Sequence, residues 1–200
     1  MRLLPSLFVL AVAAGAWSHF ANRPVSHGAG EIAPAEPVQS GDIDLPPFAH
    51  GPFRVTPAAG FEIEARVLAI EKYHAGREAE LSPLDLALGW GPMSDSAVLK
   101  RLEISQGNRF YFYRWQGQPP LPPAAIGRHS ANMHMIPADD EVGRRLDALR
   151  EGQVVALSGY LVRVRAPDGW HWNSSLSRDD TGQGACELVW VRRVAVRRGG

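Results

Sequence analysis

Apolar and polar residues alternate with a period of two over the stretch that begins at Phe61. Glu62, Glu64 and Arg66 occupy the polar positions, and apolar residues fill the positions between them. Such alternation predicts a strand with one buried face, which we expect to continue to Tyr73. Further strands are predicted at residues 102–105, 109–115, 132–136, 154–164, 170–174 and 187–196.

The segment from residue 82 to residue 89 carries the signals of a helix start and a helix end. Ser82 can cap a helix, Pro83 suits its first position, and Asp85 completes a capping-box-like pattern. Gly89 is followed by further glycine and proline, which end helices. We therefore expect a helical insertion directly after the first strand.

Two more helices are expected downstream. Ser94 predicts the start of a short helix that reaches Leu99. Asp139 or Asp140 predicts the start of a longer one, whose apolar residues share a single face. Between them, residues 116–125 contain four prolines and are expected to form a loop.

The order of these elements is strand, helical insertion, strands, helix and strands. It predicts a mainly β domain with helices, of the α+β class. A helix after the third main strand, followed by a strand pair, is the order of an OB-like small antiparallel barrel. We expect that barrel, with the helical insertion after the first strand as a departure from it. The alternative is another α+β domain with an antiparallel sheet.

Residues 1–20 are expected to direct export. Arg2 precedes an apolar run from Leu3 to Trp17, and Ala14-Gly15-Ala16 fits a cleavage site. The run is shorter than the roughly 20 residues of a membrane-spanning helix, so a signal peptide is favoured over an uncleaved membrane anchor. In either case the domain would lie in the periplasm or at the periplasmic face of the inner membrane.

The remaining chain is expected to divide into three parts. Residues 21–59 are predicted to be a linker rich in proline, alanine and glycine, because prolines interrupt helices and central strands. Residues 60–196 have the length of one ordinary domain and are expected to form the OB-like globular part. A basic tail is expected at residues 197–200.

The charge balance bears on which partners the chain binds, and the cysteine content on whether a disulfide stabilises it. Lys plus Arg and Asp plus Glu number 21 each, so the formal net charge is zero. Nucleic-acid-binding proteins usually carry a basic excess, so no nucleic-acid partner is expected. Cys186 is the single cysteine, which rules out a disulfide within the chain. We expect its thiol to be buried at the start of a strand.

Polar side chains crowd into two segments of the domain. The first extends from His129 to His134, and the second begins at His171. We expect the first segment to touch the loop from Ser174 to Thr181, with Asn132 or His134 within hydrogen-bond reach of it, since loops rich in amides and hydroxyls satisfy one another when they pair. They would form one ligand or partner surface. Its candidate residues are His129, Ser130, Asn132, His134, His171, Ser174, Arg178 and Asp179.

Aromatic residues accompany the second polar segment. Trp170 and Trp172 are two positions apart and are expected to project from one face of a strand. Core packing is the favoured interpretation of Trp172. Together with the aromatic residues of 111–115, the pair also has the composition of a stacking platform for sugars or flat ligands.

A metal site and a catalytic site are both weakly supported. His129 and His134 are five positions apart, which places them on opposite faces of a strand, and no zinc-binding motif accompanies them. No metal or other cofactor is therefore expected. A hydrolase or metal-dependent enzyme that uses His129, His134, His171 and Asp179 remains the alternative, although the chain has no Gly-x-Ser-x-Gly nucleophile elbow.

Three segments of the domain resemble a group of uncharacterised bacterial exported proteins. These segments are residues 86–95, 129–134 and 174–187. The resemblance covers most of the chain after the expected linker and implies no activity. Altogether the sequence predicts an exported envelope module that binds a small or polymeric ligand, or an envelope protein, without catalysis. Besides the binding module and the enzyme, a third candidate is a pure assembly protein of an envelope complex.

Overall fold

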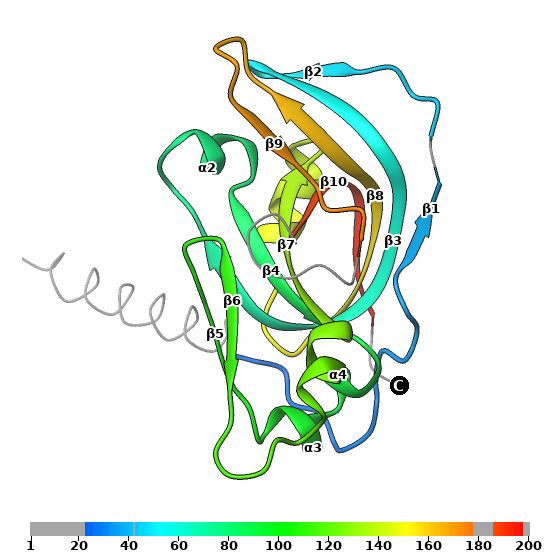
Figure 1. The fold of residues 1–200 in the computed structure, drawn as a ribbon, viewed down its shortest axis with the longest axis vertical. Coiled ribbons are helices and arrows are strands. Elements are labelled where there is room, and N and C mark those ends of the chain that lie inside the picture. Colours follow the sequence, from blue (N-terminus) through cyan, green and yellow to red (C-terminus); the bar gives the residue numbers. More distant parts are fainter. Residues whose placement is uncertain (1–22, 42, 178–185, 198–200) are drawn as a thin grey trace, which may run out of the picture.

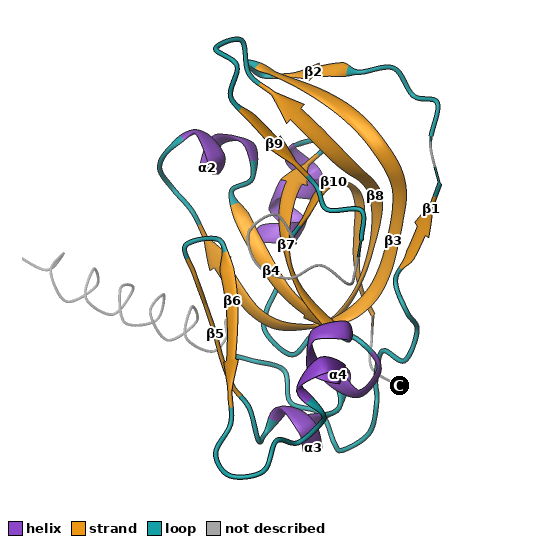
Figure 2. Cartoon of the chain, in the orientation of Figure 1, coloured by secondary structure: helices purple, strands orange, loops and turns teal. Residues whose placement is uncertain are grey.

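The computed structural model describes residues 23–41, 43–177 and 186–197. Strands dominate these residues, and the helices are few and short, so the chain is mainly β and of the α+β class (Figure 2). The strands are β1 (Val38–Ser40), β2 (Phe48–His50), β3 (Phe53–Lys72), β4 (Leu84–Gly89), β5 (Glu103–Gly107), β6 (Phe110–Arg114), β7 (Ser130–Pro137), β8 (Val154–Arg165), β9 (His171–Asn173) and β10 (Glu187–Arg197). The helices are α2 (Arg77–Leu81), α3 (Ser96–Leu99), α4 (Pro123–Arg128) and α5 (Asp140–Asp147), with a 3-10 turn at Gly91–Ser94.

The long strand β3 connects the two sides of the main sheet. Its first part pairs antiparallel with β8, and its last part pairs antiparallel with β4. From β4 the pairing continues to β7, from β7 in parallel to β10, and from β10 back to β8. The pairings of β3, β4, β7, β10 and β8 therefore return to the strand at which they began (Figure 1).

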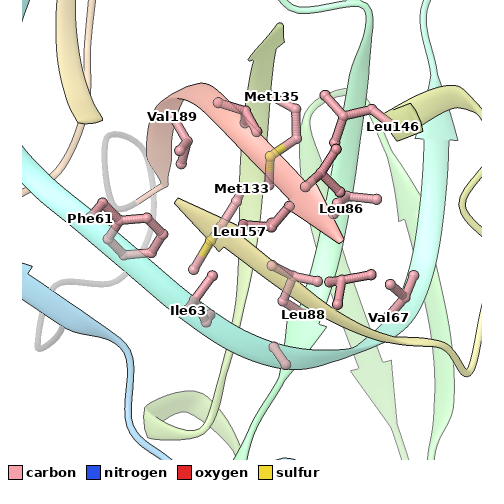
Figure 3. Packing of buried hydrophobic residues seen from close by; sticks show 14 of the residues in the cluster. Phe61, Ile63, Val67, Leu86, Leu88, Met133, Met135, Leu146, Leu157 and Val189 are labelled. Atoms are coloured by element: carbon pink, nitrogen blue, oxygen red, sulfur yellow. The ribbon is translucent and has the colours of Figure 1, made fainter. Parts of the chain in front are cut away.

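The main core lies between the inner faces of these strands. Phe61 and Ile63 from β3, Leu86 and Leu88 from β4, and Met133 from β7 are buried in it (Figure 3). The alternation of each strand supplies these residues, because successive side chains point to opposite faces. Helix α5 contributes the apolar face that its sequence predicted, made of Val142 and Leu146, with Leu149 directly after it.

The segment expected as a helical insertion is strand β4, so that prediction is wrong. Leu84, Leu86 and Leu88 alternate with Asp85 and smaller residues, which is the period of a strand. Hydrogen bonds to β3 on one side and β7 on the other satisfy its backbone. Burial of three leucines between two partner strands therefore outweighs the local capping signals.

The other two predicted helices are present. Helix α3 is capped by Asp95, whose carboxylate accepts a hydrogen bond from Ala97 N, rather than by Ser94. Helix α5 follows Asp139, whose carboxylate accepts from Val142 N. In contrast, α4 begins inside the proline-rich stretch that was expected to be a loop and extends beyond it to Arg128, with Pro123 at its first position, where proline is tolerated.

The expected linker of residues 21–59 is also corrected by the structure. Val25 N donates to Glu151 O at 2.8 Å, and Ala33 is fully buried. Phe53 and Val55, at the start of β3, are buried in a second apolar cluster. The folded domain therefore begins well before residue 60. Prolines exclude regular central strands from most of this segment, but they do not prevent it from packing along the domain.

The hairpin of β5 and β6 matches its prediction, whereas the cysteine does not. Phe110 and Phe112 face outward and are exposed, while Tyr111 and Tyr113 pack toward Ala87 on the outer face of β4. Cys186 is only partly buried, because it lies just before β10 rather than within it.

Candidate functional site

Asp85 is the centre of a buried polar network on the outer face of β4 and β7. Its side chain has no exposed surface. Asp85 and His134 are direct partners across the two strands, and Asn132 lies on the same face of β7 two positions earlier. Three leucines of β4 point into the core, so the alternation of this strand necessarily places Asp85 on the opposite face.

Arg109 provides the positive charge that a buried carboxylate requires. Its guanidinium Nη1 donates to Asp85 Oδ1 at 2.7 Å, and its Nη2 donates to Ser82 O at 2.9 Å. Glu78 adds a second, more distant carboxylate, with Oε2 3.6 Å from Nε. The Arg109 side chain is only 13% exposed, so pairing rather than solvent stabilises most of its charge.

The hairpin turn holds Arg109 in this position. Asn108 and Arg109 form the two-residue loop between β5 and β6, and both have positive φ angles, 53° and 67°. Such turns match the twist of the two strands, although a residue other than glycine pays a strain of about 1 kcal/mol or more for this conformation. The Arg109 backbone N–H donates to Tyr73 Oη, and the guanidinium lies 3.6 Å from the centre of the Tyr73 ring.

The two residues of β7 complete the network in different ways. Asn132 Nδ2 donates to Asp85 Oδ2 at 3.3 Å and to Arg109 O at 3.0 Å, and Asn132 Oδ1 accepts from Gln106 Nε2. His134 Nδ1 lies 2.9 Å from Asp85 Oδ1, but its direction gives it no hydrogen bond within the described residues. The His134–Asp85 contact is therefore a close approach of two polar groups without a hydrogen bond between them.

Aromatic rings enclose the network. The His134 and Trp172 ring centres are 4.7 Å apart, and the Arg109 guanidinium lies 5.4 Å from the centre of the Trp172 ring. Burial raises the pKa of the Tyr73 phenol to about 12, and the neighbouring Asp85 carboxylate adds to this shift. Tyr73 therefore keeps its proton throughout the physiological range.

An open cleft of about 630 Å³ lies beside this network. The chain between β3 and β4 forms one side of it, the hairpin turn another, and the turn between β8 and β9 contributes Trp170. Arg77 Nη1 donates to Asp168 Oδ1 at 3.2 Å, and its guanidinium lies 5.5 Å from the Trp170 ring centre. The cleft is lined by Tyr73, Ala75, Gly76, Arg77, Glu78, Asn108, Arg109 and Trp170.

Of the residues predicted for the site, the structure brings Asn132 and His134 together with Asp85. Ser174 is one strand away: its Oγ accepts from Leu188 N, and Leu188 is the parallel partner of His134. Within the described residues, Ser174 is therefore linked to His134 through β10, although the His134 ring lies directly against Trp172 of β9. Arg178 and Asp179 lie outside those residues.

The other predicted residues serve separate local structures. His129 Nδ1 lies 2.7 Å from Ala125 O at the end of α4, and its Nε2 lies 3.5 Å from Glu36. Ser130 Oγ donates to Ile126 O. His171 is an exposed residue of β9, where it pairs with Arg165. Ser130 shares a face of β7 with Asn132 and His134, whereas the described contacts of His129 and His171 are to other parts of the chain.

Asp85, Arg109 and Tyr73 are the residues that sequence reasoning missed. Asp85 was assigned to a helix cap, although the leucines on either side of it already indicated a strand with one polar position. Arg109 and Tyr73 carried no signal of their own, because only the folded hairpin brings them to Asp85. Among the described residues, no group of three or more His, Cys, Asp or Glu side chains is arranged to hold a metal ion.

Comparison with known proteins adds no relative to this description. No family model, no curated protein and no solved structure matches the chain. Within the part of the chain that the structure describes, no helix is long and apolar enough to cross a membrane.

Proposed function

We propose that this chain is an exported binding module of the bacterial envelope that holds an uncharged oligosaccharide, without catalysis, in the cleft beside Arg109 and Trp170. The observation that carries the proposal is that the arginines of the cleft are paired with carboxylates. Arg77 faces Asp168, and Arg109 faces both Asp85 and Glu78. The cleft therefore offers aromatic faces and oriented hydrogen-bonding groups, and each arginine among its described lining residues is paired with a carboxylate.

An OB-like barrel is the architecture we propose for the main sheet. The pairing order β3, β4, β7, β10, β8 and back to β3 supports it, as does the parallel pairing of β7 with β10. In chain order, helix α5 also falls between β7 and β8, the third and fourth of these strands along the sequence. In OB folds, the face of the second and third strands and the adjoining loops bind oligonucleotides or oligosaccharides.

The position of the cleft supports the same assignment. It lies beside the Asp85 network, which is on the outer face of β4 and β7, and is lined by the chain after β3, by the hairpin turn and by the turn after β8. Aromatic rings beside such a face favour ligands with flat or apolar surfaces, and sugar rings offer these together with hydroxyl groups. Paired arginines and a net charge of zero favour a glycan over a nucleic acid, which needs unpaired cations.

A binding role is favoured over the enzyme alternative by the positions of the histidines. His129 lies at the end of α4, His134 is buried beside Asp85, and His171 is exposed on β9. A nucleophile, a base and an orienting carboxylate must lie within hydrogen-bond reach of one another in a hydrolase. Export to the periplasm, or attachment to the periplasmic face of the inner membrane, remains part of the proposal and rests on the N-terminal sequence.

Titration calorimetry with oligosaccharides of N-acetylglucosamine and with glycan strands released from cell wall tests the proposal. The full chain should bind at least one of these probes and should not bind a single-stranded oligonucleotide. Trp170→Ala should weaken binding by roughly tenfold, because a stacked ring contributes about 1 kcal/mol or more. Mass spectrometry of the probe after incubation should show it uncleaved.

Phe112→Ala is the matched control, since Phe112 is an aromatic residue exposed on the outer face of the hairpin and does not line the cleft. It should leave the affinity within a factor of about two, in line with the small effects of isolated surface changes. Absence of binding to every glycan probe, or equal losses in both variants, would reject the glycan assignment. Cleavage of the probe would favour the hydrolase.

A further inference from the structure

A β-bulge in β10 places two successive arginines on one face of the main sheet. Val191 pairs with Gly159, but Arg193 pairs with Ser158, so Arg192 is the extra residue. Val191 and Val194 both point into the core. Without the bulge, strict alternation would point residue 193 inward with Val191. The bulge instead leaves both arginines exposed.

Glycine makes this local geometry possible. A Cβ atom on Gly159 would lie 1.9 Å from Trp190 O, directly beside the bulge. On the neighbouring strand, a Cβ atom on Gly60 would lie 2.1 Å from Ser40 Oγ of β1. Because neither position carries a side chain, the backbone of β10 and the side chain of Ser40 can approach β8 and β3 closely. Both glycines line a hollow of about 450 Å³ between β1, β3, β8 and β10, which we call the arginine hollow.

The charges in the arginine hollow differ from those in the cleft. Arg192 Nη1 donates to Tyr160 Oη at 2.7 Å, so the phenol oxygen is the acceptor and its O–H remains a donor for a ligand. Within the described residues, neither Arg192 nor Arg193 forms an ion pair with a carboxylate. Glu62 is the one acidic residue among the lining residues that the structure describes, so two guanidinium groups face a single carboxylate.

We propose that the arginine hollow binds a phosphoryl group. Guanidinium groups present planar sets of N–H donors that match the oxygens of phosphate, and Ser40, Ser158 and Tyr160 add hydroxyl groups around the same space. A phosphoryl group can be carried by a free phosphate compound or by a phospholipid headgroup. This site is separate from the glycan cleft, and its test does not depend on that proposal.

Two binding measurements on the full chain distinguish these sources. Calorimetry with inorganic phosphate and pyrophosphate measures binding of the free group. Flotation with vesicles of phosphatidylcholine, with and without phosphatidylglycerol, measures binding to the headgroup. Arg192→Gln combined with Arg193→Gln should lower the affinity for the recognised form at least tenfold, and added salt should weaken wild-type binding. The apolar N-terminal segment is common to all variants and cancels in the comparison.

Arg163→Gln combined with Arg165→Gln is the charge-matched control. Both residues are exposed on β8 and do not line the hollow, so affinity should stay within about twofold. Glu62→Gln should change affinity in the opposite direction and strengthen binding, because it removes the opposing carboxylate. Thermal unfolding of each variant checks that it is folded.

Pyrophosphate binding that depends on Arg192 and Arg193 supports a soluble phosphate compound. Binding that depends on them and occurs only with phosphatidylglycerol vesicles supports a headgroup. The proposal is overturned if neither probe binds, if the paired variant binds as wild type does, or if the control variant loses as much affinity. Unchanged or weaker binding by Glu62→Gln would also count against it.

Discussion

The Asp85 network and the arginine hollow use the same side chain in opposite ways. Arg109 is 13% exposed and meets a fully buried carboxylate, whereas Arg192 is exposed and contacts the neutral phenol of Tyr160 through its ring and its oxygen. Burial makes an unpaired charge costly, so Arg109 can remain inside only with Asp85 beside it. At the surface, water stabilises Arg192 and Arg193, which leaves their charges available to a ligand.

Charged side chains position the hairpin in the first region, whereas in the second they are available to bind a ligand. In the Asp85 network, paired charges hold the hairpin against β4 and β7. A ligand in the adjacent cleft would therefore contact residues that are already fixed in position. In the arginine hollow, the backbone bulge positions the two arginines, and within the described residues no carboxylate neutralises their charge. Loss of charge should therefore reduce stability in the first region and affinity in the second.

Removal of the buried carboxylate should have the largest effect. Asp85→Ala is expected to lower the free energy of unfolding by about 3–5 kcal/mol, because it leaves the Arg109 guanidinium without its nearest partner. Urea unfolding followed by tryptophan fluorescence measures this. Asp147→Ala is the control: Asp147 pairs with Lys72 at the surface, with 70% of its side chain exposed, and should cost about 1 kcal/mol or less. Similar losses in both would refute a structural role for the network.

Filling the space at the bulge should have the next largest effect. Gly159→Ala is expected to destabilise the chain by about 1–3 kcal/mol, since the added methyl group would overlap Trp190 O. It should also weaken phosphoryl binding by displacing the two arginines. Gly107→Ala has open space around its added methyl group and should change stability by less than about 0.5 kcal/mol. A stable Gly159→Ala variant with wild-type affinity would show that the bulge is not needed.

Loss of the amide in the network should cost less. Asn132→Ala is expected to reduce the free energy of unfolding by about 1–2 kcal/mol, because it removes hydrogen bonds to Asp85, Arg109 and Gln106. Asn173→Ala, on the exposed strand β9, is the control and should be nearly neutral. An unchanged stability of Asn132→Ala together with lost glycan affinity would identify Asn132 as a ligand-contacting residue instead.

Alkaline pH should weaken the fold through two half-buried phenols. Burial raises the pKa of Tyr73 and of Tyr111 to about 12 in the folded chain, above the ordinary value of 10.0. Their contribution to the free energy of unfolding is therefore complete below pH 10. It decreases as the pH rises from 10 toward 12, because the unfolded chain releases the phenol protons at lower pH than the folded chain does. The variant with Tyr73→Phe and Tyr111→Phe should show a shallower decline in denaturant titrations over this range. An equally steep decline would assign it to other groups.

The smallest effect on stability is expected at the arginine hollow. Arg192→Gln combined with Arg193→Gln should change the free energy of unfolding by no more than about 0.5 kcal/mol at neutral pH, because both side chains are exposed. The same urea titration measures it. A loss comparable to that of Asp85→Ala would remove the contrast between the two regions, since these arginines would then be structural as well.

Local pattern alone was sufficient for much of the fold. Alternation predicted the mainly β class, the hairpin of β5 and β6, and the strands β7, β8 and β10 within a few residues. Asp139 and the apolar face behind it predicted α5. These features depend on residues close together in the chain, where period and capping act directly.

The candidate site was only half visible in the sequence. Asn132 and His134 were expected in it, and they share a face of β7 as their even spacing requires. Asp85 and Arg109 were not expected, because β4 was assigned to a helix and the arginine reaches Asp85 only through the fold. His129 and His171 were grouped with His134 on residue type, which carries no information about distance.

The sequence by itself determined which residues alternate, which cap, and that the charges balance. Tertiary structure decided between the strand and the helix signals of residues 84–89. It alone decided that the proline-rich segment packs along the domain and that Arg192 and Arg193 share one face. The physical reason is that helix caps and single side-chain preferences contribute about 1 kcal/mol each, whereas strand pairing and burial of several apolar residues act together. Such long-range terms outweigh local preference wherever the two conflict.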